Sequence, residues 1–186
     1  MGCDKIMLIR HAERPSADKT SRGVDRAGRK DKENITVRGW QRAGALVRFF
    51  APVDDRFFAH PALARPRALY ACKAGPSAPS LRPQQTLVPL SELLTDIPFN
   101  CDFYEGEEDA LVRRVLAGPG PALVCWKHLT LHVIADLVLG DQTTAPQYWP
   151  FERYDLVWVL DLAAIGQRFT QVPQLLLAGD RADGVQ

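Results

Sequence analysis

The sequence has no apolar run that approaches the ~20 residues needed to span a bilayer. Its first residues lack the basic region and apolar segment that mark a secretory signal. The four cysteines lie far apart and form no C-x-x-C pair, so no zinc or redox motif is present. A formal net charge of +1 predicts no overall attraction to nucleic acid or to an anionic membrane. We therefore expect a cytoplasmic protein without a metal, a nucleic-acid partner or a membrane partner.

What the sequence does contain is typical of a globular protein, with 46% hydrophobic and 24% charged residues. A chain of 186 residues is long enough to bury one sizeable core and short for two. Neither an internal repeat nor a linker interrupts it. These features predict a single domain over residues 1–186 and leave the oligomeric state open.

Short apolar stretches alternate with amphipathic ones along the chain. Strands are expected at 5–9, 68–72, 98–101, 122–126, 156–160 and 169–177, and helices at 37–50 after the N-cap Thr36, at 81–94, after the acidic turn 105–109, and at 131–139 before Gly140. This alternation predicts an α/β fold, a three-layer α/β/α sandwich with a mostly parallel central sheet. Pro173 restricts the last strand to an edge of that sheet.

Residues 16–34 carry many charges and almost no apolar side chain. Such a segment cannot contribute to a core, so we expect an exposed loop. It follows shortly after the polar cluster at residues 10–14. Two interpretations are therefore open, a variable surface loop or a lid over a site.

Two of the expected strands end in the same way, on a basic residue followed by a histidine. The first ends on Arg10-His11 and the fourth on Lys127-His128. Because the carboxyl ends of parallel strands meet at one edge, the two histidines are expected to lie close together. Arg82 begins a helix after another strand and adds a further cation. Such a group of cations and imidazoles, beside free helix N–H groups, suits a tetrahedral dianion.

Phosphoryl transfer requires an in-line nucleophile and positive charge around the equatorial oxygens. His11 can supply the nucleophile if its attacking nitrogen is unprotonated and the other nitrogen donates to a backbone carbonyl. Arg10, Arg82 and a charged His128 can hold the oxygens. A single histidine after a strand more often has a structural role, and it is the pairing of two such ends that favours a site.

Several segments match a known family. Leu8-Ile9-Arg10-His11-Ala12-Glu13 resembles the R-H-G signature of the histidine phosphatase superfamily, also called phosphoglycerate mutase-like. The segment 35–43 is similar to its "LTxRGxxQA" helix start, and 82–86 to its "RxxQT" element. The segment 123–128 resembles the strand that carries the second histidine. Finally, 154–160 resembles a late strand of small bacterial members.

The resemblance implies that His11 is phosphorylated and then hydrolysed. It also implies that Arg10, Arg82 and His128 complete the phosphate pocket without a metal or another cofactor. Ala12 stands where the family most often has glycine, which places the chain with a small R-H-A-E type. The interval between Arg82 and His128 is too short for the long insertion of phosphoglycerate mutases. The expected activity is thus that of a phosphoric monoester hydrolase acting on a small phosphorylated substrate, rather than that of a mutase.

The sequence leaves open which residue acts as the general acid that protonates the leaving group. Many members have a carboxylate between the second arginine and the second histidine, and its loss typically costs ~10²–10⁴-fold. Glu105, just past a strand end, is the candidate, whereas residues 107–109 are explained as first-turn helix charges. A leaving group such as phosphohistidine or an acyl phosphate needs no acid.

Two interpretations compete with the enzyme. A phosphate-binding pseudophosphatase or adapter would keep the pocket but lack turnover. A flavodoxin-like nucleotide-binding module has no support, because no glycine-rich phosphate loop follows any strand.

Overall fold

A computed structural model describes residues 2–18, 20–76, 78–162 and 166–186. The strands are β1 (Lys5–Arg10), β2 (Ala68–Ala71), β3 (Phe99–Asn100), β4 (Ala122–Trp126), β5 (Leu156–Asp161) and β6 (Arg168–Pro173). The helices are α1 (Val37–Phe50), α2 (Arg82–Leu93), α3 (Glu108–Leu116) and α4 (Leu131–Leu139), with a 3-10 turn, η1, at Asp55–Phe57.

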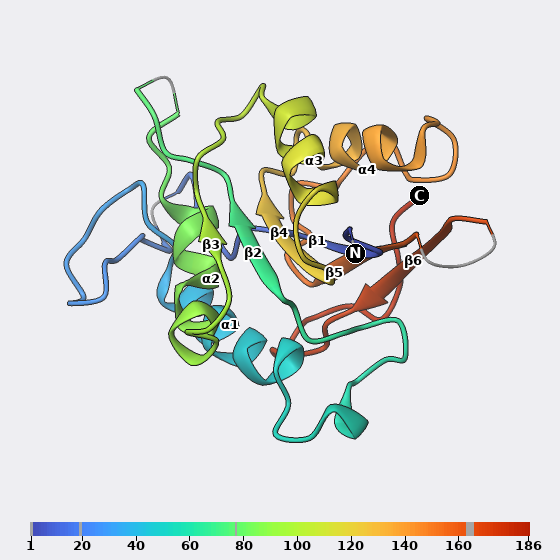
Figure 1. Ribbon diagram of the computed structural model, residues 1–186. Helices are drawn as coiled ribbons and strands as arrows, with labels where there is room; N and C mark the ends of the chain where they lie inside the picture. Colours follow the sequence, from blue (N-terminus) through green and yellow to red (C-terminus); the bar gives the residue numbers. More distant parts are fainter. Residues whose placement is uncertain (1, 19, 77, 163–165) are drawn as a thin grey trace.

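The strands form one sheet in the order β3-β2-β4-β1-β5-β6. The pairs among β1, β2, β3 and β4 are parallel, and β5 runs antiparallel to both of its neighbours. Helices α1 and α2 cover one face of the sheet, and α3 and α4 cover the other (Figure 1). The predicted three-layer α/β/α sandwich with a mostly parallel sheet is confirmed.

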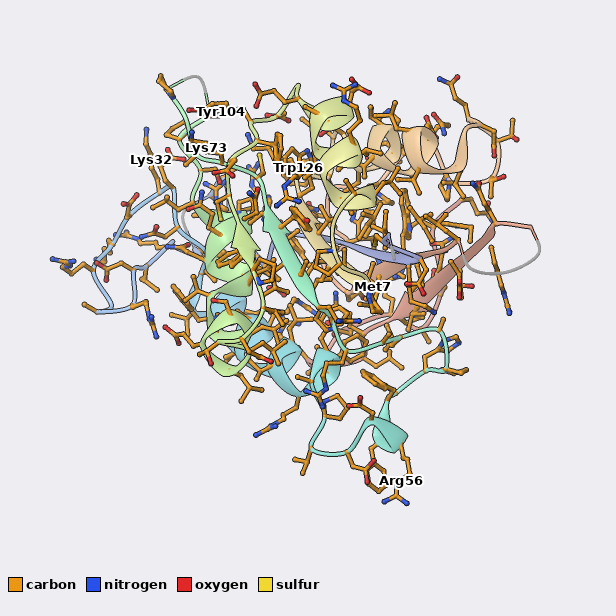
Figure 2. The ribbon with its side chains drawn as sticks, viewed as in Figure 1. Met7, Lys32, Arg56, Lys73, Tyr104 and Trp126 are labelled. Atoms are coloured by element: carbon orange, nitrogen blue, oxygen red, sulfur yellow. The ribbon has the colours of Figure 1, made fainter. Side chains whose placement is uncertain are left out.

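The side chains of β1 alternate between the two cores. Ile6 and Leu8 join the apolar cluster beneath α3 and α4, whereas Met7 and Ile9 join the cluster beneath α1 and α2. Both faces of the strand are therefore buried, which explains why it reads as a continuous apolar run. Figure 2 shows Met7 on β1 inside the sheet.

Two helix ends follow directly from the sequence. Thr36 caps α1, because its hydroxyl oxygen accepts a hydrogen bond from the Gly39 amide at 3.1 Å. Helix α4 ends at Gly140, whose φ of 75° is left-handed, as expected for a C-cap glycine. The helix predicted at 81–94 is one residue shorter at each end.

The last strand departs from the prediction. β6 occupies the predicted edge, but it ends at Pro173 and not at Leu177. One more bond in the same register follows, from the Gln174 amide to the Asp155 carbonyl at 2.8 Å, and the chain then turns at Leu175, whose φ is 51°. The segment 174–186 therefore folds back along the sheet and is not an extension of the strand.

The charged loop projects from the sheet edge at which β1 ends, on the left of Figure 1. Most of its described side chains between residues 16 and 33 are exposed or half-buried. Isolated bridges join Gly23 to Thr36 and Val24 to Lys30. The loop is therefore exposed as predicted, but its backbone is folded against itself.

Candidate active site

The carboxyl ends of β1 and β4 lie side by side and carry the two histidines. The strands pair in parallel, with Arg10 opposite Trp126. Hydrogen bonding continues one residue further, where the His11 amide donates to the Trp126 carbonyl at 3.1 Å. The sheet thus brings His11 and the pair Lys127-His128 to the same edge, as their positions at strand ends predict.

His11 is buried, and its imidazole is held in one orientation. Its Nδ1 lies 2.7 Å from the Ala12 carbonyl oxygen. Because a carbonyl only accepts, Nδ1 carries the proton of this hydrogen bond and Nε2 keeps its lone pair. Burial lowers the pKa of His11 well below its ordinary value, and the nearby Arg10, Arg82 and His128 lower it further. The ring is therefore neutral at neutral pH, with one nitrogen available as a nucleophile.

The turn after His11 is supported by α2. The Ala12 amide donates to the Thr86 hydroxyl oxygen at 2.8 Å. That hydroxyl in turn donates to the Arg82 carbonyl at 2.7 Å. The first turn of α2 therefore positions the backbone beside the nucleophile as well as carrying Arg82.

Arg82 reaches from α2 to the charged loop. Its Nη2 donates to the Lys32 carbonyl at 2.6 Å and its Nε to the Asn34 carbonyl at 3.3 Å. Burial lowers the pKa of Arg82, and the nearby Arg14 adds to this effect. Arg82 lies close enough to shift the pKa of His11, as predicted for a partner, but two of its donors also fasten the loop.

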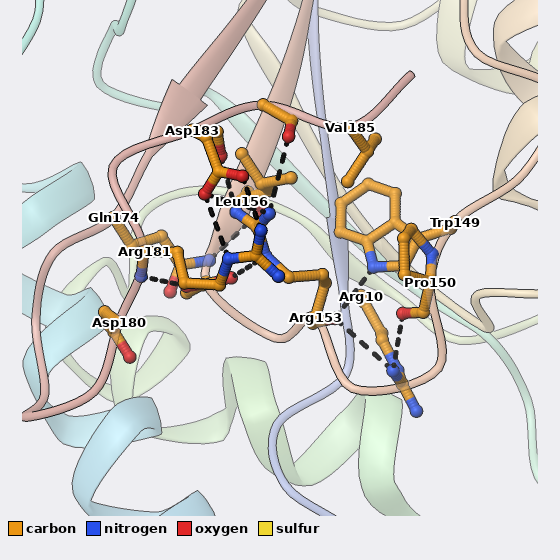
Figure 3. A network of polar contacts seen from close by, with 12 residues as sticks. Arg10, Trp149, Pro150, Arg153, Leu156, Gln174, Asp180, Arg181, Asp183 and Val185 are labelled. Carbon is orange, nitrogen blue, oxygen red and sulfur yellow. Dashed lines mark hydrogen bonds and ion pairs between the residues drawn. The ribbon is translucent and has the colours of Figure 1, made fainter.

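Arg10 is buried, and its guanidinium faces the segment before β5. Nη1 donates to the carbonyls of Phe151 and, at 3.3 Å, of Arg153, while Nη2 donates to the Tyr154 hydroxyl at 3.2 Å. The guanidinium carbon lies 3.9 Å from the centre of the Tyr154 ring. Figure 3 shows Arg10 reaching toward Pro150 and Arg153. In this state Arg10 anchors residues 150–154, and its phosphate-binding role stays a prediction.

His128 packs against the same segment, with its ring centre 5.4 Å from that of Phe151. Burial lowers the pKa of His128 to about 4, and the positive charges of Arg10 and Arg14 contribute. The imidazole is therefore neutral at neutral pH without a ligand, whereas the sequence analysis favoured a charged His128. A bound phosphate dianion would favour its protonated form.

Glu105, the candidate acid, lies beside the strand end of β4. The Lys127 ammonium donates to Glu105 Oε2 at 2.7 Å. Because Lys127 directly precedes His128, this contact holds the carboxylate near the second histidine. Among the neighbouring acids, Glu108 is buried in the first turn of α3 and accepts from Trp126 Nε1 at 2.9 Å. Glu108 thus positions the end of β4, in agreement with a structural role for residues 107–109.

The sequence analysis assigned no role to Arg14, which the structure places among the cations of the site. Its guanidinium carbon lies 4.5 Å from the centre of the Phe151 ring. Besides burial, its charge lowers the pKa of Arg10, Arg82 and His128. The available signal was a second arginine three residues after His11 in the same polar cluster.

Glu13, the carboxylate closest in sequence to His11, points away into a buried ion-pair network. Its Oε1 accepts from Nε and Nη2 of Arg42 at 2.9 and 2.8 Å. Arg42 also pairs with Asp180 at 2.7 Å. These ion pairs give Glu13 a structural role, so its position two residues after His11 does not require a catalytic one.

Neither a metal site nor a membrane span is found in the described ranges. They contain no group of three or more His, Cys, Asp or Glu side chains that could hold a metal ion. No helix within those ranges is long and apolar enough to cross a bilayer.

Comparison with solved structures identifies the architecture. A candidate phosphohistidine phosphatase SixA from Agrobacterium tumefaciens superimposes with a TM-score of 0.51, at 15% identity, over 91% of this chain and 96% of that chain. The chain has the histidine phosphatase fold. A candidate alpha-ribazole-5'-P phosphatase from Escherichia coli K-12 MG1655 matches this histidine phosphatase fold equally well, with a TM-score of 0.51 and 13% identity over 89% of this chain and 94% of that chain. No protein-family model and no curated protein matches the sequence.

Three of the sequence motifs lie where strands end or where a helix begins. The segment 8–13 completes β1 and the following turn, 82–86 forms the first turns of α2, and 123–128 completes β4. All three reach the same edge of the sheet.

Proposed function

We propose that this protein is a metal-independent phosphatase that works through a phosphohistidine at His11. One observation carries the proposal. The buried, neutral imidazole donates from Nδ1 to a backbone carbonyl, so its Nε2 is unprotonated among the cationic side chains of Arg10, Arg14 and Arg82. The histidine phosphatase fold supports it.

The proposed reaction has two steps. In the first, Nε2 of His11 attacks phosphorus, and the bond to the leaving atom breaks with its electron pair. Phosphohistidine that is protonated on its other ring nitrogen releases an imidazole, an acyl phosphate releases a carboxylate, and an alkyl phosphate releases an alcohol once its oxygen has taken up a proton. In the second, water attacks phosphorus, the phosphorus–nitrogen bond breaks, and the water gives up a proton, which leaves phosphate and neutral His11. Arg82, Arg14 and His128 would stabilise the charge on the equatorial oxygens.

The leaving group decides whether an acid is needed. Glu105 is the candidate donor, but its carboxylate is engaged by Lys127 at 2.7 Å. We therefore favour phosphohistidine and acyl phosphates, whose leaving groups need no such proton, over alkyl phosphomonoesters. The similarity to a candidate phosphohistidine phosphatase supports this substrate class.

A phosphate-binding pseudophosphatase is the second candidate, and a specific observation favours it. The Arg10 donors bind carbonyls of residues 150–153, and the Phe151 ring lies against His128. If this arrangement persists with a ligand bound, Arg10 would not be free to stabilise the charge that develops on the transferring phosphoryl group, and turnover would be impaired.

Trapping of the phosphoenzyme separates the two. With labelled phosphohistidine peptide or acetyl phosphate and EDTA present, wild-type protein should incorporate acid-labile label at His11 and release phosphate. The His11→Ala variant should do neither, because the nucleophile is absent. Retention of turnover by this variant would refute the nucleophile assignment, and loss of wild-type activity in EDTA would refute metal independence.

His60→Ala is the matched control. His60 lies beside Lys5 at the amino end of β1, at the edge opposite His11, where its Nδ1 accepts from the Ala62 amide. This variant should keep full activity. Phosphate binding by the wild type without labelling or turnover would favour the pseudophosphatase.

The remaining expectations concern partners and location. We propose a small phosphorylated substrate as the ligand, with neither nucleic acid nor membrane as a partner, in the cytoplasm. The near-neutral net charge of +1 supports the expectation that neither nucleic acid nor a membrane is a partner.

A further inference from the structure

A cavity of about 510 Å³ lies in the charged loop beside the candidate active site. Its lining includes the three cationic side chains of Arg22, Lys30 and Lys32 and a single acidic one, Asp31. The Asp31 carboxylate accepts the Glu33 amide at 2.8 Å, so one of its oxygens is already engaged. The cavity therefore has a positive surface in a protein whose net charge is only +1.

The cations of this cavity have few competing partners. Within the described part of the chain, Arg22 and Lys30 take part in no ion pair, and Lys32 makes only a 3.8 Å contact with the adjacent Glu33. Arg26 and Arg29, by contrast, pair with Glu92 and Asp25. The two arginines outside the cavity lining are therefore paired with carboxylates, whereas the cations that line the cavity remain available to bind an anion.

The cavity lies next to a second cavity that approaches the site. A neighbouring cavity of about 420 Å³ is lined by Arg14, Phe151 and Tyr154, all close to Arg10 or His128. The two cavities share the lining residues 15–17 and Ser21. The second cavity is also lined by Glu13 and Glu152. Residues 15–17 and Ser21 therefore form the shortest route by which a ligand at His11 would extend toward the three cations.

Backbone contacts hold these cations in place. The Asp31 amide donates to the Gly23 carbonyl at 3.0 Å, and Arg82 donates to the Lys32 carbonyl at 2.6 Å. Only glycine fits at position 23, since a Cβ there would lie 2.2 Å from the Asp31 carbonyl oxygen. Figure 2 shows Lys32 on this loop, which projects beyond α2. Arg82 therefore links the cavity to the phosphate site.

We propose that this cavity is a second anion-binding subsite, which selects substrates whose leaving group carries a further phosphate or carboxylate. The subsite rests on the proposed function, since it specifies the substrate class of the same site. Arg22 and Lys30 are specificity-determining residues in this scheme and take no part in bond making or breaking.

Equilibrium binding tests the subsite without requiring turnover. Calorimetry would compare alkylphosphonates with α,ω-alkylbisphosphonates over a series of spacer lengths, on the wild type and on the double variant Arg22→Gln/Lys30→Gln. At the best spacer length, we expect the bisphosphonate to bind the wild type about tenfold tighter than the monophosphonate. The double variant should lose this preference and keep its affinity for the monophosphonate.

Arg29→Gln is the matched control, because it removes a positive charge from the same loop outside the cavity and should keep the preference. Equal binding of mono- and bisphosphonates by the wild type, no binding of either, or equal losses in the double variant and in Arg29→Gln would overturn the subsite. A retained preference in a protein that hydrolyses no phosphate would leave the subsite standing and refute the phosphatase. Hydrolysis by a protein that binds mono- and bisphosphonates equally would support the phosphatase and refute the subsite.

Discussion

His11 and His128 are both held neutral, and burial is the main cause for each. His11 is almost fully enclosed, and the Ala12 carbonyl fixes the tautomer in which Nδ1 carries the proton. His128 is only half-buried, yet the charges of Arg10 and Arg14 help to lower its pKa to about 4. The site therefore suppresses protonation of both imidazoles until an anion is bound.

This suppression predicts how stability depends on pH. Each histidine has a folded-state pKa below its unfolded value of ~6.5. Below that pH the unfolded chain therefore binds protons at histidines that stay neutral in the folded protein. The contribution of these histidines to the free energy of unfolding should have its full value above pH ~6.5 and should decrease as the pH drops toward 4. In His128→Asn the fall should be shallower by at most about 1.4 kcal/mol per pH unit, and by less because His128 is half-exposed.

Denaturant unfolding of both proteins at a series of pH values measures this difference. Parallel curves for the wild type and His128→Asn across that range would show that His128 is not protonated more easily on unfolding.

At the scale of elements, the charged loop and α2 act as one unit. The Ile35 amide donates to Gln85 Oε1 at 2.9 Å, and the Leu81 amide donates to the Glu33 carbonyl at 3.1 Å. Arg82 adds its contacts with the carbonyls of residues 32 and 34. The end of the loop is thus docked on the helix that supports the turn after His11, which neither a free surface loop nor a detached lid would show.

Arg82→Ala should therefore have two effects. Vanadate or phosphate should bind about tenfold or more weakly, because a charge-assisted contact of ~1.5–3 kcal/mol is lost. Amides of residues 30–36 should also exchange with deuterium faster, because two donors to the loop backbone disappear. Exchange mass spectrometry and vanadate titration measure both effects.

Gln85→Ala separates the two roles of α2, which are to dock the charged loop and to carry Arg82 into the phosphate site. It removes loop contacts but no phosphate ligand, so it should raise amide exchange and leave vanadate affinity unchanged. Unchanged vanadate binding in Arg82→Ala would remove that residue from the site.

At the scale of the whole molecule, ion pairs join segments that are far apart in sequence. Arg42 on α1 connects Glu13, after β1, with Asp180 in the C-terminal segment. Arg153 similarly binds the Asp155 carboxylate at 2.7 Å. It also donates to the Asp183 carbonyl at 2.7 Å (Figure 3). These buried contacts hold the segment after β6 against the strand end that carries His11.

Arg42→Ala should destabilise the protein by ~3–5 kcal/mol, because it leaves two largely buried carboxylates without their main partner. Arg38→Ala is the matched control. The Arg38 side chain approaches the same Glu13 at 3.4 Å but is 46% exposed, so its loss should cost ~1 kcal/mol or less. Urea unfolding measures both changes, and equal losses would contradict a special role for the buried pair.

The sequence by itself determined the strands, their covering helices and the meeting of the two histidines, whereas the strand order and the antiparallel direction of β5 came from the structure. Apolar strands such as 5–9 and 122–126 are short-range patterns, and parallel pairing places their carboxyl ends together. The position of Arg82 at the start of α2 followed in the same way. Each of these conclusions depends on local periodicity and on one general rule of topology.

Only the tertiary structure decided what the polar side chains contact. Arg10 faces the carbonyls of residues 150–153, Glu13 faces Arg42, and Arg14 lies beside Phe151. A long charged side chain has several partners within reach, and the choice among them depends on distant segments, 29 residues away for Glu13 with Arg42 and 141 for Arg10 with Phe151. The neutral state of His128 likewise arises from burial and from charges on another strand end, which no local pattern contains.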